Sequence, residues 1–262
     1  MAVGQFGKSV FNVMDLYLKG KTALVTGSSK GIGKAIAKSL HDEGCNVVLN
    51  GRNKKTLIES VKDLERASYC VADVTKIKSC EKLLSHVIKN WKKLDILICN
   101  VGNGSSVSPG SETIMEWKRM LDINFFSSVN MIQTSKKFLE KTNGCIVCIS
   151  SIAGIEIIGA PVTYSTAKSA LNSYVKGISK PLGKKNIRIN IIAPGNILFP
   201  GSIWDKNLKE NSKKVKKMLK ENVSLQRLGI PNEIANLTTF LSSHRSSFTT
   251  GGIFIVDGGQ TH

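Results

Sequence analysis

The sequence lacks any apolar run that approaches the roughly 18 residues needed for a membrane-spanning helix, so we expect no transmembrane segment. Acidic residues are scarce, because 19 Asp and Glu face 37 Lys and Arg and leave a net charge of +18 at pH 7. Such a charge attracts anions, a class that includes nucleic acids, phosphorylated small molecules and acidic proteins. The lysines are spread along the chain without interleaved aromatic residues, so we expect no nucleic-acid partner.

The sequence also lacks the patterns that hold metal ions. It has one Cys-x-x-Cys, formed by Cys145 and Cys148, and no His-Glu-x-x-His. Residues three apart in a strand point to opposite faces, so we predict that these thiols form neither a redox pair nor half of a zinc site. The six cysteines lie mostly in apolar, strand-like runs. Such runs are typical of buried thiols in a reducing compartment, and we predict a cytoplasmic protein.

The first 13 residues, MAVGQFGKSVFNV, have no clear cleavage site, so a secretory signal is not expected. Met14 begins MDLYLKGKTALVTG, which suits the approach to a first strand. We therefore predict that residues 1–13 are a flexible extension or the product of an upstream start site. Residues 14–262 are predicted to form one domain, because one open α/β sheet routinely uses about 250 residues.

Short β-branched runs alternate with longer helical periods to the end of the chain. Several runs are apolar at successive residues, as strands buried on both faces are, for example LDILICN and RINIIA. The alternation predicts a Rossmann-like single domain, α/β and doubly wound, with a parallel sheet of about seven strands and helices on both faces. The predicted strands are Thr22–Thr26, Asn46–Asn50, Tyr69–Ala72, Leu94–Asn100, Cys145–Ser150, Arg188–Ala193 and Ile253–Val256. The predicted helices are 31–43, 53–65, 76–91, 112–141, 163–183, 204–222 and 232–243. Residues 195–222 form an insertion that is predicted to shape a substrate cleft.

The turn after the first predicted strand carries a clear chemical signal. Residues 26–33 read TGSSKGIG, and a helix is predicted to follow. Glycines let backbone N–H groups and a helix N-terminus approach a pyrophosphate without Cβ atoms in the way. Because the strand before and the helix after are the context that such a motif requires, we predict a dinucleotide-binding turn.

A Tyr-x-x-x-Lys pair, Tyr164 and Lys168, follows later in the chain, whereas a second pair, Tyr17 and Lys21, precedes the turn and is taken as a chance match. Together, TGSSKGIG and the later pair resemble the short-chain dehydrogenase/reductase family over roughly residues 15 to 260. The resemblance implies an NAD(P)-dependent oxidoreductase and a homotetramer. Within the family, the pattern is most similar to the 3-oxoacyl-(acyl-carrier-protein) reductases.

The second predicted strand ends in VVLNGRN, without the Asp or Glu that would accept hydrogen bonds from the adenosine ribose of NAD. Arg52 can instead bind a 2′-phosphate with its guanidinium fork, and Lys30 can add a second positive charge, so we predict a preference for NADPH. Asp73-Val74 resembles the adenine-binding pair of the family, with a helix-capping Asp73 as the alternative. CNVG, at residues 99–102, stands where the family usually shows Asn-Asn-Ala-Gly. The predicted cofactor-binding residues are Gly27, Ser29, Lys30, Gly31, Ile32, Gly33, Arg52, Asp73, Val74, Asn100, Gly102, Tyr164, Lys168, Pro194, Gly195 and Ile197.

Four polar side chains are predicted to carry catalysis. Tyr164 and Lys168 lie four residues apart in a helical stretch and therefore on one helix face. We expect the ammonium to lower the pKa of the phenol, so that Tyr164 can protonate a carbonyl oxygen while Lys168 also holds the nicotinamide ribose. The family spacing selects Ser151 over the adjacent Ser150 as the hydroxyl that binds the developing alkoxide. Asn124 matches the family's helix Asn that anchors a proton-relaying water.

The segment after Pro194-Gly195 departs from the family pattern. Phe199 stands where the family often has a Thr that bonds the carboxamide, a contact that we expect from the backbone or from Ser202 instead. Ser151, Phe199 and Trp204 are the predicted substrate residues. The lid around them is largely apolar and suits an acyl chain or the ring face of a sugar, with simple core packing as the alternative.

We predict reduction of a 3-oxoacyl thioester with NADPH. The alternative among enzymes is a dehydrogenase of a sugar, a polyol or another secondary alcohol, and a non-catalytic dinucleotide sensor is the alternative of another class. A sensor has no need of the four polar residues together. Five lysines near the ends of two of the predicted helices are candidates to receive an acidic carrier protein, with a solvated surface as the alternative. They are Lys136, Lys137, Lys141, Lys184 and Lys185.

Overall fold

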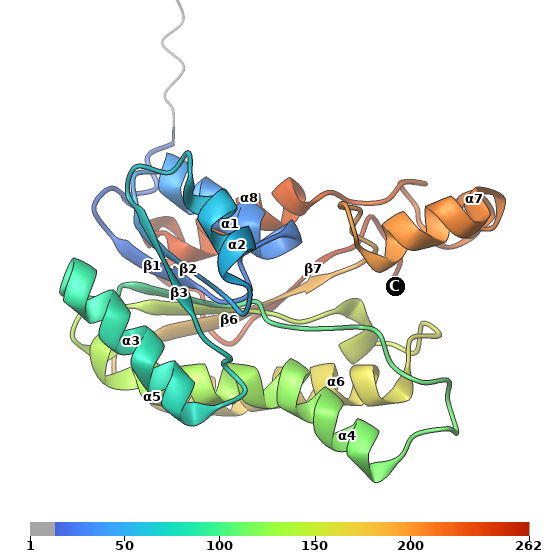
Figure 1. The fold of residues 1–262 in the computed structure, drawn as a ribbon, viewed down its shortest axis with the longest axis horizontal. Helices are drawn as coiled ribbons and strands as arrows, with labels where there is room; N and C mark the ends of the chain where they lie inside the picture. Colours follow the sequence, from blue (N-terminus) through green and yellow to red (C-terminus); the bar gives the residue numbers. More distant parts are fainter. Residues whose placement is uncertain (1–13, 262) are drawn as a thin grey trace, which may run out of the picture.

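The computed structural model describes residues 14–261, and the predicted extension of residues 1–13 lies outside them. The described residues form a parallel sheet of seven strands in the order β3-β2-β1-β4-β5-β6-β7 (Figure 1). The strands are β1 Thr22–Val25, β2 Asn46–Gly51, β3 Ala67–Val71, β4 Ile96–Cys99, β5 Cys145–Ile149, β6 Arg188–Pro194 and β7 Ile253–Val256. The strand order reverses between β1 and β4, so ligands are expected at the carboxyl ends of these strands. The predicted doubly wound sheet is confirmed.

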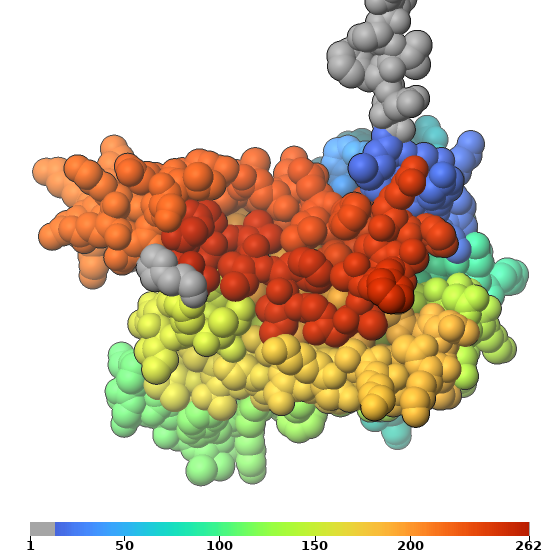
Figure 2. All heavy atoms as spheres, turned by 180° about the vertical axis from the view of Figure 1, so that it is seen from behind, coloured from blue at the N-terminus to red at the C-terminus, as the bar shows by residue number. Residues whose placement is uncertain are grey.

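Helices cover both faces of the sheet (Figure 1). On one face lie α1 (Gly31–Asp42), α2 (Lys54–Val61) and α8 (Pro231–Ser242). On the other lie α3 (Ile77–Trp91), α5 (Ser127–Glu140) and α6 (Val162–Gly183), with α4 (Ile114–Leu121) packed beside α6. The helix α7 (Ile203–Asn222) projects beyond the carboxyl-end edge of the strands. Figure 2 shows the opposite side, where the C-terminal segment that includes β7 lies between α7 and α6.

The central strands divide their side chains between two cores. Every residue of β1, β4 and β5 is buried, because helices cover both faces of the sheet. In β5, Cys145 and Val147 face the core beneath α1 and α8, whereas Ile146 and Cys148 face the core beneath α3, α5 and α6. Cys145 and Cys148 therefore lie on opposite faces, as predicted, and all six cysteines are free.

The prediction of one continuous helix over 112–141 is wrong in one respect. The structure has two α-helices there, α4 and α5, which are separated by the π-helical turn η1 (Asp122–Phe126). A π turn inserts an extra residue into the helix and is often found at functional sites. Asn124 lies in this turn. Two short 3₁₀ turns, η2 (Ile152–Gly154) and η3 (His244–Ser246), complete the elements.

Two further observations concern the part of the chain that the structure describes. Within residues 14–261, no helix combines the length and the apolar composition that crossing a membrane requires. In the same range, no three His, Cys, Asp or Glu residues gather in a way that could hold a metal ion.

Candidate active site

The predicted dinucleotide-binding turn leads from β1 into α1. Lys30 is the N-cap residue of α1 and contributes no side-chain hydrogen bond, so the first N–H groups of the helix are free of a side-chain cap. Gly33 has no room for a side chain, since a Cβ there would lie 2.4 Å from Nδ2 of Asn100 and 2.5 Å from the carbonyl oxygen of Gly27. An uncapped helix N-terminus behind a turn with glycines at its points of close approach fits the pyrophosphate of a dinucleotide.

Two asparagines, at the ends of the strands on either side of β1, hold this turn in shape. Nδ2 of Asn100 donates to the carbonyl oxygens of Thr26 and Gly27, each at 3.0 Å. Asn50 is buried at the end of β2, where its Nδ2 donates to two main-chain carbonyls beside β3 at 3.2 and 3.1 Å. Asn100, a predicted cofactor residue, thus supports the turn from beneath. Sequence reasoning gave Asn50 no role, although a polar residue after the apolar run VVL is a detectable signal.

The end of β2 lies against the same turn. A Cβ built on Gly51 would lie 3.3 Å from Oγ of Ser29. Arg52 and Lys30, the residues that follow these two, therefore extend from adjoining backbone. Both side chains are exposed, and neither has a hydrogen-bond or ion-pair partner within residues 14–261. Two unpaired cations thus flank the outer end of the turn.

The other predicted cofactor residues lie around the turn at the carboxyl ends of the strands. Oδ1 of Asp73 accepts from the backbone N and Oγ1 of Thr75 at 3.1 and 2.8 Å, which forms a local turn. Val74 and Ile197 are buried, so their main chains are the parts that can reach a ligand. Gly195 leaves no space for a side chain, because a Cβ there would lie 2.7 Å from Cβ of Asp257. The remaining predicted residues at this edge are Ser29, Gly31, Ile32, Gly102 and Pro194.

Tyr164 and Lys168 come from the first turns of α6, and Ser151 comes from the end of β5. Lys168 is 2% exposed, and its Nζ donates to the carbonyl oxygen of Ile149 at 2.9 Å. The hydroxyl of Ser151 lies near the phenol of Tyr164, where its interaction with the phenol lowers the pKa of Tyr164. Ser150 instead donates to the carbonyl oxygen of Lys168 at 3.5 Å. Of the two serines, Ser151 is therefore the one that faces the phenol.

The pKa values in this cluster correct one expectation. Burial raises the pKa of Tyr164 above its ordinary value, and the hydrogen bond from Ser151 offsets this rise in part. Burial also lowers the pKa of Lys168 to about 8, because desolvation disfavours the charged form. The expectation that the ammonium lowers the phenol pKa is wrong here, since Lys168 bonds to Ile149 and burial dominates at Tyr164. A raised pKa keeps Tyr164 protonated at neutral pH, which suits a proton donor.

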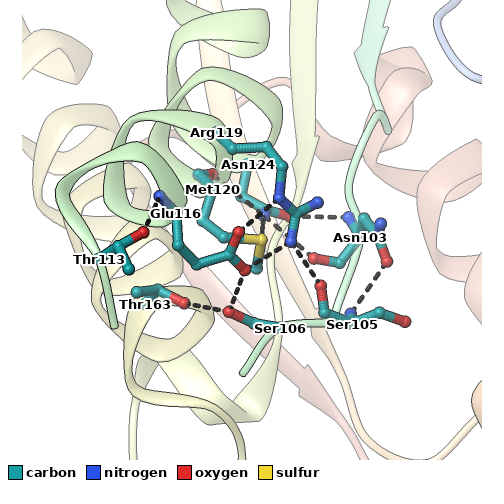
Figure 3. Close-up of polar contacts among 9 residues, drawn as sticks. All are labelled: Asn103, Ser105, Ser106, Thr113, Glu116, Arg119, Met120, Asn124 and Thr163. Carbon is teal, nitrogen blue, oxygen red and sulfur yellow. Dashed lines mark hydrogen bonds and ion pairs between the residues drawn. The ribbon is translucent and has the colours of Figure 1, made fainter. Parts of the chain in front are cut away.

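Asn124 is buried in the π turn and holds the loop that follows β4 (Figure 3). Its Oδ1 accepts from the backbone N of Asn103 at 2.8 Å, and its Nδ2 donates to the carbonyl oxygen of Asn103 at 3.1 Å. A Cβ on the neighbouring Gly102 would lie 3.1 Å from Oδ1 of Asn124 and 3.2 Å from Nζ of Lys168. The same glycine thus separates Asn124 from Lys168, and the structure brings the four predicted catalytic side chains together.

Two further segments border the phenol. A Cβ built on Gly104 would lie 3.3 Å from Cδ1 of Ile203 and 3.8 Å from Cζ of Tyr164. Ile203, the first residue of α7, is 44% exposed and was not singled out in the sequence. Trp204 instead packs into a small core beneath α7 with residues that include Leu219. The core-packing alternative thus describes Trp204, and Ile203 occupies the position beside the cleft.

Comparison with known proteins identifies the family. The chain is 34% identical over 255 residues to the 3-oxoacyl-(acyl-carrier-protein) reductase FabG of Chlamydia muridarum, and the alignment covers 94% of this chain and 100% of that protein. A family profile described as Enoyl-(Acyl carrier protein) reductase matches residues 27–261. The chain belongs to the short-chain dehydrogenase/reductase family. It is an oxidoreductase of this family that acts on CH–OH and C=O groups.

Solved structures of short-chain dehydrogenases share the fold and differ in ligand. A 7α-hydroxysteroid dehydrogenase complexed with NADH and 7-oxo glycochenodeoxycholic acid is 31% identical, with a TM-score of 0.86 and coverage of 94% of this chain and 96% of that one. The L-sorbose reductase from Gluconobacter frateurii, complexed with NADPH and L-sorbose, is 28% identical, with a TM-score of 0.89 and coverage of 94% and 98%. Because these proteins differ in substrate and cofactor, the specificity of this chain must be argued from its own residues.

One departure from the family pattern, Phe199, lies against the dinucleotide-binding turn. Its ring atoms are 2.6 to 2.9 Å from a Cβ built on Gly31, so the ring covers the turn at the start of α1. Ser202, the other candidate for the carboxamide contact, is buried as the N-cap of α7, where its Oγ accepts from the backbone N of Asp205 at 3.1 Å. An aromatic ring therefore stands where the family often has a hydroxyl.

The five lysines considered for carrier docking lie far from this site. Tyr164 stands near the start of α6 and Lys184 just after its end, so a rise of 1.5 Å per residue separates them by about 30 Å. Lys185 is ion-paired with Glu140 at 3.0 Å, which places the ends of α5 and α6 side by side. This surface therefore lies about 30 Å along the helix from the phenol. The residues concerned are Lys136, Lys137, Lys141, Lys184 and Lys185.

Proposed function

We propose that this chain is an NADPH-dependent reductase that converts a ketone, in particular a 3-oxoacyl thioester, to a secondary alcohol. The observation that carries the proposal is the meeting of Tyr164, Ser151 and Lys168 beside the dinucleotide-binding turn. A dinucleotide sensor needs the turn but has no use for a half-buried phenol beside a buried hydroxyl and a buried ammonium at its edge. NADPH supplies the hydride when it is bound.

The protein's own residues manage the carbonyl oxygen and its proton. Tyr164 donates its phenolic proton to the carbonyl oxygen, because its raised pKa keeps the proton in place until then. Ser151 hydrogen-bonds the same oxygen as negative charge develops on it. Lys168, beside Gly102, holds the nicotinamide ribose with its ammonium. Asn124 fixes the main chain of Asn103 next to these groups and provides the anchor for a proton-relaying water.

The preference for NADPH is supported by the two unpaired cations at the turn. A guanidinium forms paired hydrogen bonds to a phosphate, and Arg52 extends from backbone adjoining that of Lys30. The strand end VVLNGRN offers no carboxylate that would repel a 2′-phosphate. These features favour NADPH over NADH.

The substrate class is supported by the apolar side chain of Ile203, which lies beside Gly104 near the phenol, and by the charge of α7. This helix begins beside the phenol and projects from the molecule (Figure 1). It carries seven lysines, and ion pairs within residues 14–261 involve two of them, Lys209 and Lys217. An acidic carrier is therefore better placed on α7 than on the distant lysines of α5 and α6. The α7 lysines are Lys206, Lys209, Lys213, Lys214, Lys216, Lys217 and Lys220.

Initial rates with NADPH and a panel of ketones test the substrate class. The panel contains acetoacetyl thioester on an acidic carrier protein, the same acyl group on a short thiol, L-sorbose and a 7-oxo steroid. We expect the highest kcat/KM for the carrier-bound thioester, with a loss at high salt that the short thioester does not show, because salt screens the α7 lysines. A higher kcat/KM for the sugar or the steroid would overturn the acyl assignment and favour the alternative of a sugar or alcohol dehydrogenase.

The rate of ketone reduction is expected to depend on the proton of Lys168. Its pKa is lowered to about 8, so the ammonium is lost above that pH, whereas the raised pKa of Tyr164 keeps the phenol protonated over the same range. We therefore expect kcat/KM to be level near neutral pH and to fall above pH 8. Lys168→Arg, which keeps its charge, should show residual activity without this fall. A wild-type profile that stays level to about pH 10, near the ordinary lysine value, would contradict the assignment.

Phe199→Thr is expected to tighten NADPH binding about five-fold. The change uncovers the turn at Gly31 and supplies a hydroxyl, which is worth roughly one hydrogen bond. Titration of NADPH fluorescence gives the Kd, and Phe240→Thr on α8 is the matched control because it removes a ring outside the turn. Weaker binding by Phe199→Thr would show instead that the ring supports the cofactor.

We also propose a homotetramer, which the family resemblance implies. Two groups of large apolar side chains are exposed: Phe248 and Ile255 at the edge strand β7, and Ile114, Met115 and Phe126 along α4 and η1. The surface that includes β7 is the one seen in Figure 2. Two separate apolar surfaces are what an assembly with two kinds of interface requires. Light scattering of the purified protein tests this, and a monomeric mass would overturn it.

A further inference from the structure

The segment of residues 103–106, in the loop after β4, is held on its inner side by Asn124 (Figure 3). Both main-chain groups of Asn103 bond to the Asn124 side chain, at 2.8 and 3.1 Å. Oδ1 of Asn103 in turn accepts from the backbone N of Ser105 at 2.9 Å. The conformation of the segment is thus coupled to a residue of the catalytic cluster.

The outer side of the same segment is held by a charged pair on α4. The hydroxyl of Ser106 donates to Oε1 of Glu116 at 2.6 Å, and Arg119 donates from Nε to Oε2 of Glu116 at 2.7 Å. Arg119 also donates from Nη2 to the carbonyl oxygen of Ser105 at 2.9 Å. The carboxylate therefore bonds the segment directly and orients a guanidinium that bonds it a second time (Figure 3).

The network reaches the first turn of α6. The hydroxyl oxygens of Ser106 and Thr163 are 2.7 Å apart. Because Ser106 gives its one proton to Glu116, Thr163 is the donor in this pair. Thr163 is buried and directly precedes Tyr164. Glu116 is thus two hydrogen bonds away from the residue that adjoins the phenol.

Glu116 is a charged anchor in this network. The bonds from Arg119 and Ser106 lower the pKa of its carboxyl to about 2, so the group is ionised at every working pH. Its side chain is 13% exposed, although it lies on a surface helix. A Glu three residues after a Thr N-cap commonly bonds back to the cap residue, here Thr113, whereas Glu116 turns to the loop.

The held segment places Gly104 between Ile203 and the ring of Tyr164. A Cβ at Gly104 would lie 3.3 Å from Cδ1 of Ile203 and 3.8 Å from the ring of Tyr164, so the glycine leaves a space the size of a methyl group between the lid and the phenol. A shift of the segment by a few tenths of an ångström would widen or close this space. Its width is therefore set by whatever fixes residues 103–106.

We propose that Glu116 is a positioning residue of the substrate cleft: through Ser106 and Arg119 it fixes Gly104 opposite Ile203 and thereby sets the size of the ketone that reaches Tyr164. The inference rests on the proposed ketone reductase function. Glu116 touches neither substrate nor cofactor. Its effect is therefore on the KM and selectivity for the ketone, and not on NADPH binding or on the proton transfer itself.

Glu116→Gln tests this role, because glutamine keeps the size of the side chain and removes the charge that binds Arg119. We expect KM for the ketone to rise about tenfold, as when a charge-assisted contact is weakened, while kcat and the Kd of NADPH stay within about two-fold. We also expect the ratio of kcat/KM for a small over a bulky ketone to fall. Glu140→Gln, which removes a surface carboxylate paired with Lys185, is the matched control and should leave all values unchanged.

Gly104→Ala is the second variant, and it fills the space between Ile203 and Tyr164 with a methyl group. The new methyl group contacts the flexible end of Ile203, so the fold is expected to survive, and the bulky ketone should lose at least about tenfold more kcat/KM than the small one. The inference would be overturned if Glu116→Gln left KM and selectivity unchanged, or if Gly104→Ala lowered kcat/KM equally for both ketones. In either case, turnover of the ketone by the wild-type protein would still support the proposed reductase function. A wild-type protein that turns over no ketone would overturn the proposed function itself.

Discussion

Replacing Tyr164 by phenylalanine is expected to lower kcat for ketone reduction by about 10²–10⁴-fold, the range that a positioned proton donor contributes. The phenylalanine ring fills nearly the same space, so the buried site and the turn are expected to keep their shape. Only the phenolic hydroxyl is lost, with its proton and its interaction with Ser151. Steady-state rates measure the loss, and NADPH fluorescence measures the Kd, which should stay within about two-fold because the change leaves the turn at Gly31 intact.

Tyr174→Phe provides the matched control for this experiment. Tyr174 lies on the same helix, its phenol accepts from Nε2 of Gln133 at 3.1 Å, and burial raises its pKa as well. It packs against Gln133 of α5 and Phe125 of η1, so its loss should cost little activity. If Tyr164→Phe retains half of the wild-type kcat, or if Tyr174→Phe is equally damaging, Tyr164 is not the proton donor.

Replacing Arg52 by aspartate is expected to reverse the cofactor preference. The change removes the guanidinium that can bond a 2′-phosphate and adds a carboxylate that repels the phosphate and accepts from ribose hydroxyls. We expect the ratio of kcat/KM for NADPH over NADH to fall about 100-fold, the combined effect of a lost charge-assisted pair and a new repulsion. The measurement is the kcat/KM of each cofactor at a fixed, saturating ketone concentration.

A matched charge change separates a specific contact from the general field of a protein with a net charge of +18. Lys62→Asp makes a comparable change at the far end of α2 and should alter the cofactor ratio less than about two-fold at moderate salt, where distant charges are screened. If Arg52→Asp leaves the ratio unchanged, Arg52 does not read the phosphate. If both variants lower it equally, the preference comes from net charge.

The fold and the catalytic cluster could be predicted because each rests on a local pattern. Strands such as CIVCI are apolar at successive residues because both faces are covered, and that pattern is visible in the sequence. The turn before Gly33 needs glycines for close approach, and a spacing of four residues puts Tyr164 and Lys168 on one helix face. Sequence could identify these residues without any knowledge of their neighbours.

What could not be predicted depends on contacts between distant segments. The direction of the pKa shift at Tyr164 follows from burial, which a motif does not report. The π turn at Asn124 lies within a segment that was predicted as one continuous helix, because the sequence carries no distinct signal for the inserted residue. The choice of Ile203 over Trp204 beside the cleft depends on the rotation of α7 about its axis. The distance of the candidate carrier surface from the phenol could not be predicted, because Lys184 and Tyr164 share a helix but lie near its opposite ends.

The role of Glu116 was likewise hidden from the sequence. On its own helix it is an ordinary acidic residue three positions after a Thr cap, a pattern that predicts a capping box. Its partners Ser105 and Ser106 come from a loop in which the sequence shows no regular pattern. The function of such a residue emerges only when the loop is seen against the helix.

The most direct test of the proposed function is NADPH oxidation by the purified protein with acetoacetyl thioester, measured in parallel with NADH. We expect turnover that consumes one NADPH for each 3-hydroxyacyl thioester formed, and a much lower kcat/KM with NADH. A protein that binds NADPH but oxidises neither cofactor with this or any other ketone would contradict the assignment as a reductase.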